Sequence, residues 1–111
     1  MFDMMKMMGK LGEIKTRMAE AQESIAKLEV SGESGGGMVK ARMNGNRKLT
    51  GLQIDPELMN PADADMLKDL VIAAVNDAAN RMEELTKEEM KKHTGDLLPN
   101  IPGLDLGAFR V

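Results

Sequence analysis

The sequence predicts an α+β domain made of a long N-terminal helix, a three-stranded antiparallel β-meander and a long C-terminal helix. Apolar residues follow a helical spacing at the start of the chain and again in its second half, and they alternate with polar residues in between. A chain of 111 residues has the length of one domain. We expect this domain to cover residues 1–95, and residues 96–111, with two prolines and no apolar period, to form an irregular tail.

The first helix is expected over residues 4–28, where an apolar residue recurs at every third or fourth position. This spacing is typical of a helix that packs on a nearly parallel partner. Only two residues of the chain are aromatic, so we interpret the methionines of the seam as flexible core filling. The seam consists of Met4, Met7, Leu11, Ile14, Met18, Ala21, Ile25 and Leu28.

Three strands are expected next, because the apolar period changes from helical spacing to alternation. Residues 28–34 form the first strand, and the glycines at 35–37 form the turn after it. In the second strand one face carries Val39, Ala41 and Met43, and the other carries Lys40, Arg42 and Asn44.

A tight hairpin is expected at residues 44–46, Asn-Gly-Asn, because these residue types readily adopt the positive φ angles that such turns need. The third strand then runs back over residues 47–54. One of its faces carries Thr50, Leu52 and Ile54.

Two helix-start signals follow the sheet. Asp55 before Pro56 is expected to cap one short turn, and Asn60 before Pro61 to start the main helix. This helix should run to about His93 and end at Gly95. Its apolar face consists of Leu67, Val71, Ala74, Ala78, Met82 and Leu85.

The two helices are too long for a small sheet to cover. At 1.5 Å per residue they would measure about 40 Å and about 50 Å, whereas a compact domain of this size has a radius of gyration near 13 Å. The remaining apolar surface should therefore be buried on a second copy, as a twofold homodimer that also protects a sheet edge. Candidate core or dimer residues are Leu11, Ile14, Met18, Ile25, Val39, Ala41, Leu52 and Ile54.

The sequence does not predict an enzyme, a metal site or a cofactor. The glycine-rich stretch at residues 28–46 lacks the Gly-Lys-Ser/Thr ending of a phosphate-binding loop, so we interpret it as hairpin turns. There is no cysteine, and His93 is the only histidine and is explained by the helix dipole. Asp63 and Asp65 fit a helix cap better than a cation site. The glutamates Glu83, Glu84, Glu88 and Glu89 are interpreted as a solvated face.

The charge distribution points to a polyanion despite the net charge of −3. Residues 30–54 carry four basic side chains and one acidic one, whereas residues 55–111 carry six and twelve. Without interleaved aromatic residues, contact with the backbone of duplex DNA is favoured over base stacking. Candidate DNA-binding residues are Lys6, Lys10, Lys15, Arg17, Lys40, Arg42, Arg47, Lys48, Lys87, Lys91 and Lys92.

The chain is expected in the cytoplasm. Charged residues interrupt the apolar start, no small-residue cleavage site follows it, and no run of 18 apolar residues occurs. The lack of cysteine gives no indication of an oxidising compartment.

Several motifs, in order and spacing, resemble the YbaB/EbfC family of bacterial nucleoid-associated proteins. They are Gly-Glu-Ser-Gly at residues 32–35, Asn44-Gly45, Ile54-Asp55-Pro56 and Asn76-Asp77-Ala78, and the resemblance covers roughly residues 18–92. It implies an α-β-β-β-α fold and a tweezer-like homodimer that binds double-stranded DNA. It also implies a place in the nucleoid, with roles in nucleoid organisation, gene regulation or recombination and repair, and no catalysis.

The chain departs from the family pattern in a first helix richer in Met and in the tail ending LDLGAFRV. An alternative function rests on the Met-rich start of the chain and is favoured by its negative net charge. A surface formed by Met4, Met5 and Met8, together with the tail, would dock a protein partner, because methionine side chains adapt to varied partners. In this scaffold interpretation DNA binding is weak or absent.

Overall fold

The computed structural model describes residues 2–95, and these form two helices, three strands and three short 3₁₀ turns in the order α-β-β-β-α. Helix α1 spans Phe2–Ala26 and helix α2 spans Ala64–Thr94. The strands are β1 (Glu29–Ser34), β2 (Val39–Asn44) and β3 (Leu49–Ile54). The predicted fold class is confirmed. The expected tail lies outside the described residues.

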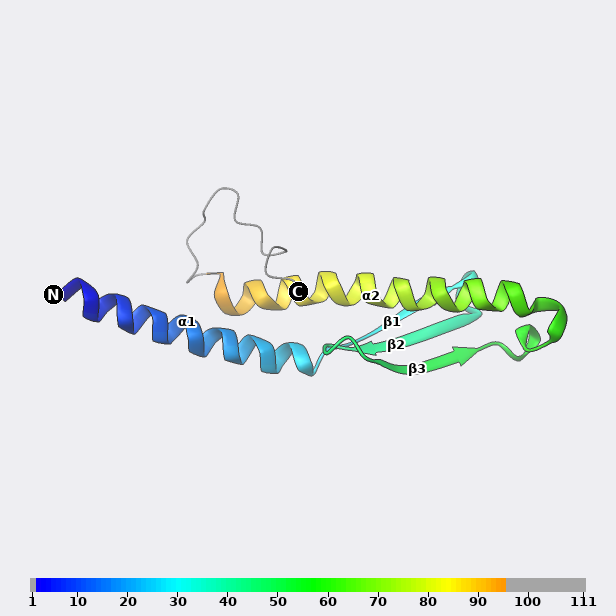
Figure 1. Cartoon of the computed structure of the whole chain (residues 1–111), viewed down its shortest axis with the longest axis horizontal. Helices are drawn as coiled ribbons and strands as arrows, with labels where there is room; N and C mark the ends of the chain where they lie inside the picture. Colours follow the sequence, from blue (N-terminus) through cyan, green and yellow to red (C-terminus); the bar gives the residue numbers. More distant parts are fainter. Residues whose placement is uncertain (1, 96–111) are drawn as a thin grey trace, which may run out of the picture.

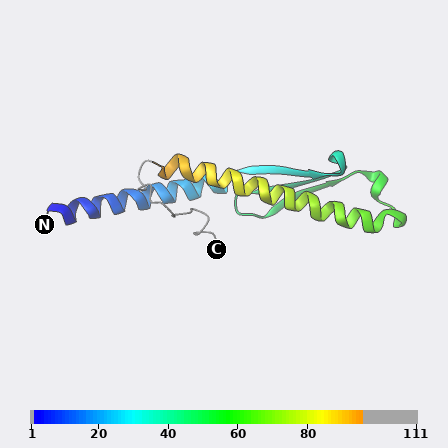
Figure 2. The same ribbon diagram turned by 90° about the horizontal axis from the view of Figure 1, so that it is seen from above.

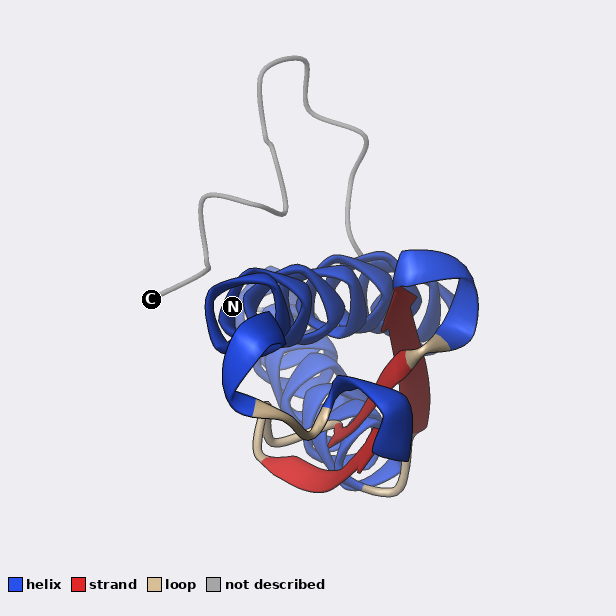
Figure 3. Cartoon of the chain, turned by 90° about the vertical axis from the view of Figure 1, so that its right-hand side faces the viewer, coloured by secondary structure: helices blue, strands red, loops and turns tan. Residues whose placement is uncertain are grey.

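The molecule is a rod of 73 × 26 × 19 Å with a radius of gyration of 19.7 Å. Helix α2 extends along the sheet and then beside α1, and the N-terminal part of α1 projects past the end of α2 (Figure 1). Turned by 90°, α1 and the sheet occupy opposite ends, with α2 bridging them (Figure 2). A view along the long axis shows the narrow cross-section (Figure 3).

The sheet is an antiparallel meander with the strand order β1-β2-β3. In the β1–β2 pair Gly32 lies opposite Ala41, and in the β2–β3 pair Ala41 lies opposite Leu52. The alternation predicted for β2 is confirmed, since Val39, Ala41 and Met43 are buried while Lys40 and Arg42 are exposed.

The core lies between β2, β1 and the middle of α2. The α2 residues Ala74, Ala78 and Met82 are fully buried against the inner face of β2, and Leu58 closes one end of the cluster. Strand β1 approaches α2 closely because Gly32 has no side chain and Ala74 and Ala78 have small ones. A Cβ at Gly32 would collide with the α2 backbone at Ala74 and Ala78. Gly32 therefore sets the distance between sheet and helix.

Much of the predicted seam is exposed in one chain. Leu11 is 64% exposed, Met18 is 44% exposed, and Leu52 on β3 is also 44% exposed although it lies opposite the buried Ala41. Among the other candidate core or dimer residues, Ile25, Val39 and Ala41 are buried, and Ile14 and Ile54 are half-buried. The single chain thus leaves apolar surface on α1 and β3.

The predicted hairpin forms, but its positive φ angle is at Arg47 (φ 61°) and not at residues 44–46. Asn44 shapes the turn, because its Oδ1 accepts the N–H groups of Asn46 and Lys48 at 3.0 and 3.1 Å. Gly45 is needed for a different reason. It donates its N–H to the Leu28 carbonyl at 2.9 Å, and a Cβ there would collide with the carbonyl of Ile25.

The element ends differ slightly from the predicted ones. Helix α1 ends at Ala26, two residues earlier than expected, and the following turn is closed by the Leu28 N–H to Ile25 carbonyl bond of 3.0 Å. Strand β3 begins at Leu49, because residues 45–48 are used by the hairpin turn. Asn60 caps a 3₁₀ turn, Pro61–Asp63, which leads directly into α2.

Candidate nucleic-acid interface

The α1 cations divide between two sides of the helix. Lys6, Lys10 and Arg17 are spaced by four and seven residues and share one side, which also carries Glu13, whereas Lys15 lies on the opposite side. All four cations are exposed. None of them takes part in an ion pair within residues 2–95, so their charges are free to meet an external anion.

The two β2 cations are in a less favourable setting. The Arg42 Nε lies 3.1 Å from Oε1 of Glu29, and Lys40 lies opposite Glu33 in the β1–β2 register. The outer face of the sheet therefore alternates basic and acidic side chains. A phosphate approaching Arg42 would compete with the Glu29 carboxylate and be repelled by it.

The β2–β3 turn presents Arg47 and Lys48, both exposed and both without an ion pair in the described part of the chain. The Asn44 side chain fixes the backbone of this turn through its bonds to Asn46 and Lys48. The turn thus offers two cations on an ordered loop.

The cations at the end of α2 are mostly paired. The Lys87 Nζ lies 3.8 Å from Oε1 of Glu83, and the Lys92 Nζ lies 3.6 Å from Oε2 of Glu89. Glu89 also lies 3.3 Å from Nε2 of His93. The Glu89 side chain is only 17% exposed, so the four glutamates Glu83, Glu84, Glu88 and Glu89 do not form a purely solvated face. Lys91 makes no ion pair within residues 2–95.

The fold distributes these cations unevenly along the rod. The C-terminal end of α2 lies beside α1, so Lys91 and the α1 cations share one end of the molecule (Figure 1). The β2–β3 turn reaches only the C-terminal end of α1, through the Gly45 to Leu28 bond. Residues 55–69, at the opposite end, carry five acidic side chains and one basic one. One end of the rod is therefore acidic, whereas the helical end, where α1 carries four basic and four acidic side chains, presents unpaired cations from α1 and Lys91.

Asp77 has a structural role that charge patterns did not indicate. Its Oδ2 accepts the backbone N–H of Glu33 at 2.9 Å and the Nε–H of Arg81 at 3.1 Å. The Glu33 N–H bond is the main reason why the pKa of the Asp77 carboxyl lies below its usual range; burial opposes this shift and Arg81 adds to it. This contact ties the edge strand β1 to α2. The Asn76-Asp77-Ala78 motif was its only signal in the sequence.

The described residues give no sign of a metal centre. Across residues 2–95 no three His, Cys, Asp or Glu side chains are grouped so that they could hold an ion. Asn60 Oδ1 accepts the Asp63 N–H at 3.0 Å, and Asn60 Nδ2 donates to Asp63 Oδ2 at 2.7 Å, as a helix cap would. Neither α1 nor α2, within the same residues, has the length and apolarity of a membrane span.

Comparisons with known proteins agree with this fold. Residues 1–97 match the model of the YbaB/EbfC DNA-binding family. The chain is 43% identical over 107 residues to a nucleoid-associated protein of Afipia carboxidovorans, covering 96% of this chain and 100% of that protein. It is 48% identical over 96 residues to one from Chlorobium limicola, covering 86% and 82%.

Among solved structures, the crystal structure of an uncharacterized protein from Helicobacter pylori superimposes with a TM-score of 0.64 at 30% identity. The superposition covers 74% of this chain and 86% of that one. Fold, motif order and sequence identity all lead to the same assignment. The chain belongs to the YbaB/EbfC DNA-binding family.

Proposed function

We propose that this protein is a non-enzymatic, nucleoid-associated protein that binds double-stranded DNA as a homodimer, mainly through the phosphate backbone. The carrying observation is the set of exposed, unpaired cations at the helical end of the rod, Lys6, Lys10 and Arg17. Four other unpaired cations would add to the contact with DNA: Lys15, Arg47, Lys48 and Lys91. A smaller contribution is expected from the ion-paired cations Arg42, Lys87 and Lys92. Lys40, opposite Glu33, belongs with the weaker group.

A homodimer is supported by the apolar surface that one chain leaves uncovered. Met4, Met7, Leu11 and Met18 lie along one stripe of α1 and are 44–68% exposed. Leu52 marks a second open patch, where β3 extends beyond the cover of α2. Pairing two copies would bury this surface and bring two sets of α1 cations into one particle.

The dimer is tested with neighbouring positions on α1. Met18→Glu places a charge on the exposed seam, whereas Ala19→Glu places it one residue away from the seam. We expect light scattering to give the mass of two chains for the wild type and for Ala19→Glu, and a lower mass for Met18→Glu at the same concentration. A monomeric wild type at micromolar concentration would contradict the dimer.

DNA binding is tested with matched charge variants. Neutralising Lys6, Lys10 and Arg17 together to Gln removes three unpaired cations, whereas neutralising Arg42, Lys87 and Lys92 to Gln removes three paired ones. In a gel-shift titration of duplex DNA at low salt, we expect the first variant to bind much more weakly and the second to stay close to the wild type. No wild-type complex at micromolar dimer would overturn the proposal.

The protein-scaffold alternative is favoured by the exposure of Met4, Met5 and Met8, which are 68%, 75% and 69% exposed. The tail it also invokes lies outside the described residues. Reversing the charge of Lys6, Lys10 and Arg17 separates the two functions. If the wild type shifts no DNA and partner capture survives the charge reversal, the scaffold function replaces DNA binding.

The family assignment supports a proposal for the biological setting. We propose that the protein acts in the cytoplasm on the nucleoid, in DNA organisation, gene regulation or recombination and repair. The Afipia and Chlorobium relatives are named nucleoid-associated proteins, which supports this location.

A further inference from the structure

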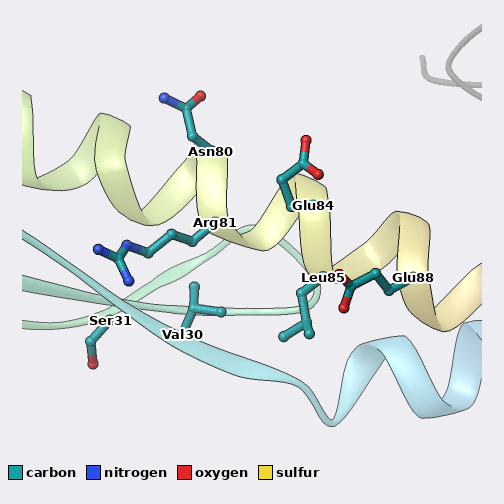
Figure 4. A pocket seen from close by; sticks show the side chains of 7 residues that line it. All are labelled: Val30, Ser31, Asn80, Arg81, Glu84, Leu85 and Glu88. Carbon is teal, nitrogen blue, oxygen red and sulfur yellow. The ribbon is translucent and has the colours of Figure 1, made fainter.

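A groove of about 480 Å³ runs between the edge strand β1 and the second half of α2. Its floor is apolar, with Val30 and Leu85 facing one another, and charged side chains border it (Figure 4). Arg81 lies toward one end and Glu88 toward the other, with Glu84 between them along the helix. The separation from Arg81 to Glu88 along the helix axis is about 10 Å.

The groove is suited to an extended segment that carries an apolar side chain between an acidic and a basic one. DNA is a poor occupant, because Glu84 and Glu88 are exposed and would repel phosphate. The groove also lies along the edge of the sheet, where β1 has a paired neighbour on one side only. An extended peptide therefore finds an apolar floor, two kinds of charge and backbone groups in one place.

We propose that residues 104–110 of the same chain, Leu-Asp-Leu-Gly-Ala-Phe-Arg, occupy this groove. Phe109 would cover the apolar floor formed by Val30 and Leu85, and Arg110 would face Glu88. Asp105 would face Arg81, whose Nε–H is donated to Asp77, so Asp105 would meet the other N–H groups of the guanidinium. The acidic residue precedes the basic one in the segment, as Arg81 precedes Glu88 along α2, so both charges match when the segment runs parallel to the helix. The five residues from Asp105 to Arg110 span up to about 17 Å when extended, and the long side chains of Arg81 and Arg110 would cover the difference from about 10 Å.

The length of the chain permits this placement. Arg81 lies about 21 Å before Gly95 along α2, and the ten residues from Gly95 to Asp105 span up to about 33 Å when extended. The chain has to turn back along the helix to do so. Pro102-Gly103 is a dipeptide that favours such a turn.

The experiment uses the full-length protein with the substitution Ala108→Cys and a spin label on the new thiol. The natural sequence has no cysteine, so the label attaches at this position alone, and nearby methyl groups are detected by nuclear magnetic resonance. We expect the methyl signals of Val30 and Leu85 to lose intensity several-fold. Two other signals should remain: that of Ile72, which lies 13 residues or about 20 Å before Leu85 along α2, and that of Leu58, a core residue that does not line the groove. Equal broadening at all four positions would overturn the proposal.

Charge exchange makes the test specific. Adding Arg110→Glu should restore the Val30 and Leu85 signals, and adding Glu88→Arg to that variant should broaden them again. The matched control is Asp69→Arg, an exposed acidic position on the same helix outside the groove, which should not bring the broadening back. If Arg110→Glu has no effect, the segment does not bind as proposed.

A mixture distinguishes the same chain from a second copy. Isotope-labelled protein without the spin label is combined with unlabelled protein that carries it, so only contacts between chains broaden the signals. We expect no broadening at Val30 or Leu85 in this sample. Broadening of the full size there would show that the groove takes the segment of another copy and would overturn the intramolecular placement.

Discussion

At the scale of single residues, the joint between sheet and helix depends on Gly32 and Asp77. Gly32 has no Cβ where the α2 backbone passes, and Asp77 accepts the N–H of the next residue of the strand, Glu33. The Ser34 Oγ donates to the carbonyl of Leu70 at 2.5 Å, which adds a third contact along β1. Three consecutive residues thus attach an edge strand to α2.

Gly32→Ala should destabilise the protein by about 3 kcal/mol, because the new Cβ collides with the backbone of Ala74 and Ala78, which cannot rotate away. Gly51→Ala on β3 is the matched control, since its Cβ would meet the Arg42 Cβ at an ordinary 3.6 Å. We expect the control to change the free energy of unfolding by less than about 1 kcal/mol. Urea denaturation followed by circular dichroism measures both, and equal effects would contradict the packing described.

Asp77→Asn should flatten the dependence of stability on acid pH. The Glu33 N–H bond, with Arg81, lowers the pKa of the Asp77 carboxyl in the folded protein below its value in the unfolded chain. The ionised carboxylate therefore makes its full contribution to the free energy of unfolding above the unfolded pKa. This contribution is lost as the pH falls through the folded pKa. Urea midpoints measured from neutral pH downward should therefore decline more steeply for the wild type, and parallel curves for the two proteins would refute the coupling.

At the scale of elements, the sequence predicted both helices, all three strands and the buried face of β2. Apolar periodicity determines these features directly, as for Val39, Ala41 and Met43. The position of the positive φ angle at Arg47 was not predicted, because the turn is closed by backbone and side-chain bonds to Asn44 that the residue types alone do not specify. The ion pair between Arg42 and Glu29 was not predicted either, because it depends on the register of β1 against β2, which the composition of the strands does not determine.

We expect the buried residues of α2, and not its exposed methionines, to contribute most to the stability of the protein. Met82 is fully buried against the sheet, so Met82→Ala should cost about 3 kcal/mol of stability through the cavity that it leaves. Met66, on the same helix, is 48% exposed, and Met66→Ala should cost less than about 1 kcal/mol. Thermal or urea unfolding of the two variants checks this, and a similar loss for both would contradict the core assignment.

At the scale of the whole molecule, the charged side chains are distributed unevenly along the rod. Residues 55–69, at one end of the rod, carry five acidic side chains and one basic one, whereas α1, at the other end, carries four of each and is neutral overall. The α1 cations make no ion pair within residues 2–95, and Lys6, Lys10 and Arg17 share one side of the helix. The candidate list from the sequence could not separate paired from unpaired cations. Ion pairs such as Lys87 with Glu83 and Lys92 with Glu89 reduce the list to a smaller set.

The most direct test of the account is the salt dependence of duplex DNA binding by the wild-type protein. Fluorescence anisotropy at a series of salt concentrations gives the slope of log K against log salt. If the dimer contacts DNA through Lys6, Lys10 and Arg17 of both chains, the slope should reach about −5, because each phosphate neutralised contributes about −0.9. Binding that does not change with salt would contradict backbone recognition by the α1 cations.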